Sequence, residues 1–208
     1  MHGGVLMTTS SPGRGATRPR GVLRAVVLLL ACALFSVRAR GEDHAARNFL
    51  IESGSLSYQL VHKLHEVEGK TRAIEGRALV STDGSVRVQV RAKVASFDSG
   101  NANRDAHMRE VTHEPIHAYA SVQGRLAGLH LPLAAPIELP MSATVELNGE
   151  KQPATIPVKF QPEGAGIRAT FSFPISLEGF KVERPELLFV KVDDRIQLTG
   201  DLLFAEAR

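Results

Sequence analysis

The chain has 208 residues, 43% of them hydrophobic, so it can bury one sizeable core but is short for two full domains. Its formal net charge is +3, yet residues 1–41 hold six of the 25 Lys and Arg residues and no Asp or Glu. The remainder carries 19 basic and 22 acidic residues, which gives no electrostatic support for nucleic-acid binding. The composition therefore predicts no nucleic-acid partner.

The first 41 residues have the pattern of a secretory signal peptide, with a short linker reaching to about residue 51. Three arginines between residues 18 and 24 form a positively charged region, and Ala25–Val37 is apolar apart from Ser36. This apolar stretch is too short to span a bilayer comfortably. We expect a periplasmic or secreted protein without a stable membrane span after processing, with an uncleaved anchor as the alternative.

Two processing routes are open for this leader. Val37-Arg38-Ala39 offers small residues for ordinary cleavage, which we favour, whereas Leu29-Leu30-Ala31-Cys32 resembles a lipoprotein acylation box. Cys32 is the only cysteine, so cleavage after it leaves the mature chain without a disulfide or a thiol nucleophile. The mature domain must then rely on its hydrophobic core.

From Ser55 onward, apolar and polar residues alternate with period two, as in strands with one buried face. In the clearest run, Ser85–Ala95, four valines and an alanine share one face and charged or amide side chains share the other. Runs of this kind predict strands near residues 56–64, 73–81, 85–95, 117–126, 141–147, 156–160, 167–175, 188–192 and 196–204.

Turn residues connect these runs. Asp83-Gly84 and Asn148-Gly149 supply the positive φ angles of tight hairpins, and the segment 163–166 contains two glycines. The prolines of Leu129–Pro140 predict a loop. About eight strands with short connections indicate an all-β protein, a single extended antiparallel β-barrel over residues 52–208.

The main interruption of the strand pattern is Ser99–Val111. Asn101 or Asn103 can cap a short helix there, near residues 101–110.

Five histidines could bring a metal site together: His62, His65, His107, His113 and His117. On one extended strand His62 and His65 would point to opposite faces, and no paired-ligand signature supports them. We predict no metal or cofactor and keep a metal-dependent envelope enzyme as an alternative.

Catalytic signatures are also missing from the sequence. There is no glycine-flanked serine elbow and no phosphate-binding loop. We interpret Asp193-Asp194 as the solvated tip of a hairpin. We therefore predict no catalytic residues and no enzyme activity.

The apolar strand faces carry mostly medium or small side chains, such as Val86, Val88, Ala143 and Ala169, and the chain has no Trp. A barrel of about eight strands can either fill itself with side chains or hold one ligand. The residue pattern alone leaves both open; a filled barrel would suit a scaffold or stress protein.

One segment favours the hollow barrel. Ala95–Met108 contains Ser-Phe-Asp-Ser-Gly-Asn followed by Arg-Asp-Ala-His-Met, and it resembles the signature of the YceI-like family of exported proteins. The segment from Tyr58 to Gly76 is similar to the first hairpin of that family. The resemblance covers roughly residues 52–206.

The resemblance implies a lipocalin-like barrel whose long apolar pocket holds a polyisoprenoid, an isoprenoid quinone or a similar lipid. It implies a mouth beside Asp98, Arg104, Asp105 and His107, where charged side chains could tie the helix to the strand ends or orient a head group. Homodimers are compatible with the family.

From this resemblance and the alternation we predict eleven ligand-binding residues: Tyr58, Leu60, His62, Leu64, Val88, Val90, Phe97, Arg104, His107, Phe171 and Phe173. The chain departs from the family after the helix, where Val111–Tyr119 lacks the usual aromatic pair and Tyr-Pro element. The depth of the pocket and the ligand therefore stay open.

Overall fold

A computed structural model describes residues 46–62, 65–184, 186–187 and 190–207. The signal peptide predicted for residues 1–41 lies outside this range. The barrel strands are β1 (Arg47–His62), β3 (Ile74–Val80), β4 (Val86–Lys93), β5 (Tyr119–Leu126), β6 (Ile137–Leu147), β7 (Glu150–Glu163), β8 (Gly166–Ser176) and β11 (Arg195–Glu206).

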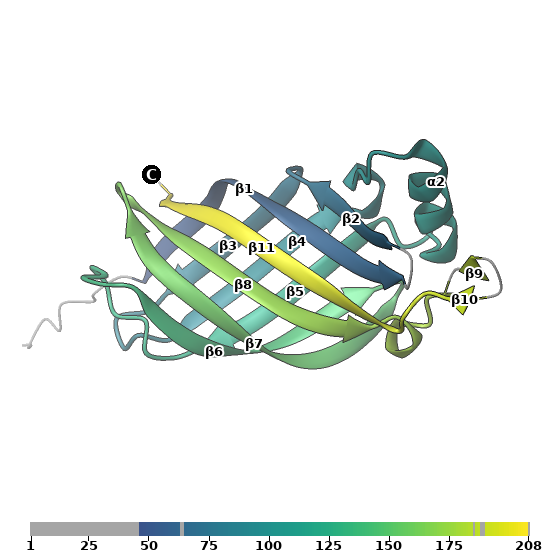
Figure 1. Cartoon of the computed structure of the whole chain (residues 1–208). Coiled ribbons are helices and arrows are strands. Elements are labelled where there is room, and N and C mark those ends of the chain that lie inside the picture. Colours follow the sequence, from purple (N-terminus) through teal and green to yellow (C-terminus); the bar gives the residue numbers. More distant parts are fainter. Residues whose placement is uncertain (1–45, 63–64, 185, 188–189, 208) are drawn as a thin grey trace, which may run out of the picture. The chain divides into compact units, whose positions relative to one another are not determined.

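These eight strands form a closed antiparallel ring (Figure 1). Each strand pairs with the next in chain order, and β11 pairs with β1 to complete the circle. One further strand, β2 (His65–Thr71), pairs with the C-terminal half of β1, on the edge where β3 pairs with its N-terminal end, and extends the wall of the barrel there. Closure removes the free edges that an open sheet would expose. The predicted antiparallel barrel of about eight strands is confirmed.

A bulge in β1 changes which residues face the interior. The register with β11 shifts between Ile51 and Ser53, and Gly54 follows with φ 147°. A Cβ at Gly54 would lie 2.3 Å from the carbonyl oxygen of Asp201, so only glycine fits this close approach. Odd-numbered residues before the bulge and even-numbered residues after it therefore point inward.

The predicted helix is present as α2 (Ala102–Val111). Asn101 is its N-cap: the side-chain oxygen accepts hydrogen bonds from the backbone N–H of Asn103 (3.0 Å) and of Arg104 (3.2 Å).

The predicted loop Leu129–Pro140 is wrong at its C-terminal end, because β6 begins at Ile137. Pro140 lies opposite Pro157 of β7, and neither has an N–H to donate. Two prolines can face each other where a pair of residues exchanges no ladder hydrogen bonds, so these prolines do not interrupt the sheet.

The strand predicted near residues 188–192 does not join the barrel. Instead β9 (Glu186–Leu187) and β10 (Val190–Lys191) form a separate two-stranded sheet. The physical reason is that β8 and β1 already pair with the two sides of β11, so the ring offers no free position.

The two predicted glycine turns differ in form. In the β6–β7 hairpin, Asn148 and Gly149 have φ of 52° and 74° and join the paired residues Leu147 and Glu150, as in a tight two-residue turn. Between β3 and β4 only Gly84 has a positive φ, of 78°, and the connection is longer.

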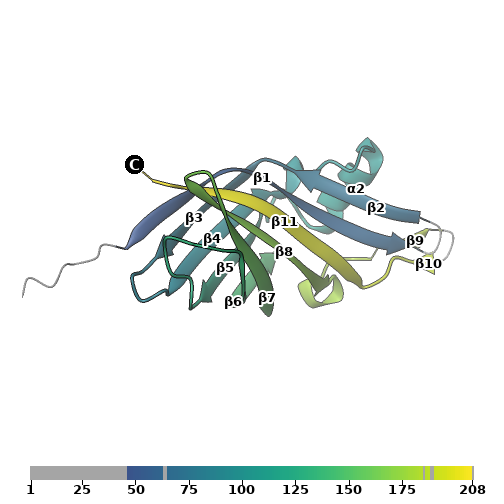
Figure 2. The ribbon, with the colours of Figure 1, turned by 60° about the vertical axis from the view of Figure 1, so that its left-hand side comes forward.

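Several connections gather at one end of the barrel, which we call the mouth. It carries the end of the β1–β2 hairpin, α2, η2 (Glu178–Phe180) and the β9–β10 sheet, as Figures 1 and 2 show from two directions. Within the described residues, no helix is long and apolar enough to cross a membrane.

Candidate ligand-binding cavity

The interior of the barrel holds a cavity of about 480 Å³. Its lining comes from every strand of the ring and is overwhelmingly aliphatic and aromatic. The volume lies within the range of small-molecule sites, about 300–1,000 Å³. Along β11 the lining runs from Ile196 to Phe204, about 25 Å of strand at the usual rise per residue. The lining therefore follows the strands along the barrel, which suits an extended chain.

The hollow lies in the middle of the barrel. Val88, Val122, Phe171 and Leu198 face inward on four different strands, yet each keeps part of its surface accessible. Inward side chains that met at the axis would be fully buried. The structure thus favours the hollow alternative over the filled one.

At the end opposite the mouth, by contrast, the inward side chains are buried against one another. They include Phe49, Val86, Leu126, Phe160 and Phe204. Leu129, in the connection after β5, is only 2% exposed and belongs to the same core cluster. Its N–H donates to the carbonyl of Gly84 (3.1 Å), which joins two connections at this end. We call this the closed end.

Inward glycines make room for the largest lining side chains. A Cβ at Gly200 would lie 2.1 Å from Cζ of Phe171, and a Cβ at Gly69 would lie 2.3 Å from Cζ of Tyr58. Each ring therefore lies over the backbone of the neighbouring strand. This arrangement keeps two rings against the wall, so the central space stays open.

The mouth is bordered by apolar residues from two connections. Met108 and Val111 of α2 line the cavity from one connection, and Leu177, Val182 and Val192 line it from the segment between β8 and β11. Four of the five are buried, the exception being Met108.

Asn148 links these mouth elements through hydrogen bonds. Its amide nitrogen donates to the carbonyls of Phe180 and Lys181, each at 3.1 Å. Its amide oxygen accepts from Nδ1 of His113, just beyond α2, at 2.8 Å. Because Asn148 is only 8% exposed, these bonds are protected from water. The turn at the end of β6 therefore holds both borders of the mouth.

The segment before α2 is fixed by a second set of hydrogen bonds. The buried carboxylate of Asp105 accepts from the backbone N–H (3.0 Å) and the hydroxyl (2.6 Å) of Ser99. Arg104 donates to the carbonyl (2.6 Å) and hydroxyl (3.2 Å) of Ser99. Asp98 exchanges backbone hydrogen bonds with Lys70 of β2. The side chains of Asp105 and Arg104 thus hold Ser99 before α2, and the backbone of Asp98 joins this segment to β2.

Tyr58 and Phe97 meet near the mouth, with ring centroids 5.7 Å apart, and both line the cavity. Burial, and to a smaller degree the charge of Asp105, raise the pKa of the Tyr58 hydroxyl. The hydroxyl therefore stays protonated and able to donate a hydrogen bond.

Nine of the eleven residues predicted to bind ligand line the cavity. They are Tyr58, Leu60, Val88, Val90, Phe97, Arg104, His107, Phe171 and Phe173. Leu64 and the side chain of His62 lie outside the described residues.

The sequence reasoning did not identify Phe49, Met108, Val111 or Leu177 as lining residues. Phe49 precedes the bulge, where the alternation changes phase, and the others lie outside the barrel strands. The spacing of Met108 and Val111, three residues apart and therefore neighbours on the helix surface, was the available signal.

The histidines occupy separate positions. His107 Nδ1 lies 3.4 Å from Glu110 within α2, His113 contacts Asn148, and the ring of His117 lies against Gly149. His62 and His65 are paired residues of the β1–β2 hairpin and not members of one strand, so the expectation of a single extended strand is wrong. In the part of the chain that the structure describes, no three metal-ligating side chains come together.

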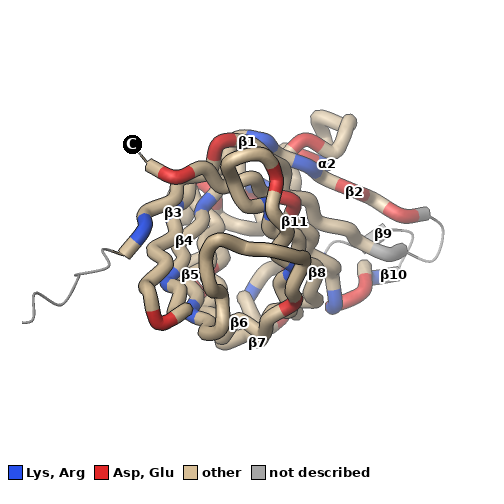
Figure 3. The backbone as a smooth tube through the Cα atoms, turned by 90° about the vertical axis from the view of Figure 1, so that its left-hand side faces the viewer, with Lys and Arg blue, Asp and Glu red and all other residues tan. Residues whose placement is uncertain are grey.

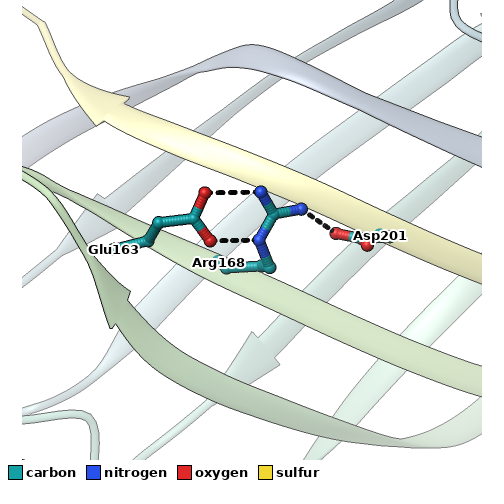
Figure 4. A network of polar contacts seen from close by, with 3 residues as sticks. All are labelled: Glu163, Arg168 and Asp201. Carbon is teal, nitrogen blue, oxygen red and sulfur yellow. Dashed lines mark hydrogen bonds and ion pairs between the residues drawn. The ribbon is translucent and has the colours of Figure 1, made fainter.

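Basic and acidic residues are spread over the strands (Figure 3), and exposed ones such as Arg91 and Lys159 alternate with buried residues. One ion-pair network joins three neighbouring strands: Arg168 of β8 donates to Glu163 of β7 and to Asp201 of β11 (Figure 4). The hydrogen bonds from Arg168 lower the pKa of Glu163 below its usual range. These contacts lie outside the cavity and brace the strand ends.

Comparison with known proteins agrees with this geometry. The family model described as YceI-like domain matches residues 47–204. The chain belongs to the YceI-like family. No curated protein matches the chain significantly.

Solved structures show the same fold. A polyisoprenoid-binding domain from Saccharophagus degradans has 15% sequence identity and a TM-score of 0.62, over 76% of this chain and 98% of that domain. BcnA of Burkholderia cenocepacia has 18% identity and a TM-score of 0.60, over 72% and 95%. The YceI protein of Campylobacter jejuni has 13% identity and a TM-score of 0.58, over 71% and 89%.

Proposed function

We propose that this YceI-like protein binds one apolar long-chain lipid, such as a polyisoprenoid or an isoprenoid quinone, and sequesters or carries it in the bacterial cell envelope. The observation that carries the proposal is the 480 Å³ cavity lined by hydrocarbon side chains from the whole ring. The related fold of a polyisoprenoid-binding domain adds support.

The energetics favour a chain over a compact ligand. Each methylene moved from water into the cavity contributes about 0.8 kcal/mol, roughly a fourfold gain in affinity. The cavity is elongated and offers few polar groups along its middle, so affinity has to come from the length of apolar chain that it covers.

We further propose that the protein binds its ligand without catalysing a reaction. The predicted ligand contacts along the strands, such as Val88, Val90 and Phe173, are side chains that cannot transfer protons or attack a substrate. Export to the periplasm or beyond, with residues 1–41 as the signal peptide, completes the proposed role.

Organic extraction of the protein purified from its native host, followed by mass spectrometry, tests the proposal. We expect a hydrocarbon-rich molecule in near one-to-one ratio with the protein. A series of straight-chain alcohols should then bind with affinity that rises about fourfold per methylene until the cavity is full.

The opposite result would be equally clear. If the extracted protein is empty and affinity does not depend on chain length, the cavity does not serve a lipid.

A further inference from the structure

The polar groups that line the cavity are placed unevenly along it. The closed end is packed with apolar side chains, and Arg104, His107 and the Tyr58 hydroxyl lie at the mouth. A chain that enters a tube open at one end keeps its last-entering group at the opening. The placement therefore distinguishes the two ends of a ligand.

Hydrogen bonds to Ser99 hold Arg104 in place. Nε and Nη2 donate to Ser99, whose own position is fixed by the 9%-exposed carboxylate of Asp105. Within the described residues no carboxylate lies within ion-pair distance of Arg104, and Nη1 has no protein acceptor. A guanidinium held in this way loses little conformational entropy when it binds an acceptor.

His107 lies one helical turn beyond Arg104 and lines the same part of the cavity. Its Nδ1 is turned toward Glu110, and its ring leaves a second nitrogen for a ligand. The acids that line the cavity are Glu146 of β6 and Glu183, which follows η2, whereas the lining residues of α2 include no acid. The α2 side of the mouth is thus the side that suits negative charge.

We propose that the cavity takes an amphiphile with a single anionic head group, of the phosphate or carboxylate type, and that Arg104 and His107 bind this head at the mouth while the chain lies toward the closed end. This inference rests on the proposed function and narrows its ligand class. An uncharged hydrocarbon would offer no acceptor to Nη1 of Arg104, since Nε and Nη2 already donate to Ser99.

The test compares ligands that share one chain. Farnesol and farnesyl monophosphate are titrated against the full mature protein by displacement of a fluorescent fatty-chain probe at low salt. We expect the phosphate to bind at least tenfold more tightly, as suits charge-assisted hydrogen bonds. Arg104→Gln should weaken the binding of farnesyl monophosphate much more than that of farnesol, and so remove most of this preference.

The matched control is Arg109→Gln, which removes the same charge from the same helix at a residue that does not line the cavity. It should keep the tenfold preference. Circular dichroism verifies that both variants are folded, because Arg104 also supports the loop at Ser99.

Each outcome has a distinct meaning. Equal binding of farnesol and its phosphate by the unaltered protein, or a preference that survives Arg104→Gln, overturns the head-group site and leaves the proposed function standing. Competition by inorganic phosphate as strong as by farnesyl phosphate also overturns it, because the site would then take a free anion. If neither prenyl compound binds, the proposed function itself fails.

Discussion

Phe171 of β8 lies so close over Gly200 of β11 that a Cβ at Gly200 would come within 2.1 Å of its Cζ. Gly200→Ala should therefore force the ring toward the lumen or move the strands apart. We expect a loss of about 1–3 kcal/mol in the free energy of unfolding, measured by denaturant titration.

Two variants control this prediction. Gly179→Ala adds the same methyl where the nearest atom is 3.4 Å away, and it should change stability little. Phe171→Leu should recover part of the loss in the Gly200→Ala background, so that the double-mutant cycle shows a clear coupling. Additive effects would mean that the two residues do not touch.

Val88→Phe tests whether the middle of the barrel is hollow. Val88 faces inward but stays partly accessible, so a larger side chain has room. Ligand content should fall by about twofold or more because the lumen narrows, while the free energy of unfolding is unchanged or higher. Thr144→Phe, on the outer face of β6, should leave ligand content unchanged. A loss of about 1–3 kcal/mol for Val88→Phe would instead indicate a packed core.

Arg87 and Arg125 are paired residues on neighbouring strands, both exposed on the outer wall. Like charges directly opposite each other destabilise a sheet, so Arg125→Glu should raise the free energy of unfolding by about 0.2–1 kcal/mol. The gain should shrink at high salt. The double variant with Arg87→Glu places two acids opposite each other, and there the gain should vanish.

Stability should fall in acid because of carboxylates with lowered pKa. Hydrogen bonds from Arg168 lower the pKa of Glu163, and those from Arg47 do the same for Glu206. A depressed native pKa means that the unfolded chain binds more protons, so the contribution is present above the ordinary value of 4.5 and is lost as pH falls through the native pKa.

Arg168→Gln provides the check on this pH dependence. Its unfolding free energy should decline less steeply between neutral and acidic pH than that of the unaltered protein. NMR titration should show the pKa of Glu163 moving back toward its ordinary value. An unchanged pKa would contradict the role of Arg168.

Much of the fold follows from the sequence because one physical signal dominates it. The alternation of Val86, Val88 and Val90 with polar residues indicates a strand with one buried face, and the barrel bears this out. A helix cap at Asn101 or Asn103 could also be predicted, since the chemistry of a capping side chain is local, and the structure has the cap at Asn101. The signal fails at Phe49, where the β1 bulge reverses the phase of the pattern.

The remaining features depend on contacts that no local pattern records. Leu129 packs into the closed end from a connection, and Asn148 joins two mouth elements that are distant in the sequence. Short apolar runs near residues 188–192 look like a barrel strand, but ring closure leaves them no partner. Whether the inward side chains meet is likewise decided by the diameter of the ring, not by their order in the chain.

The packed layer around Leu129 affects the rate at which ligands of this barrel exchange. If ligands enter and leave only opposite this packed layer, the bound ligand has to dissociate before a new one can bind. Exchange of one ligand for another should then proceed at the dissociation rate of the first, whatever the concentration of the second. Such a protein would release its ligand slowly unless another molecule that binds at the entrance raises the dissociation rate.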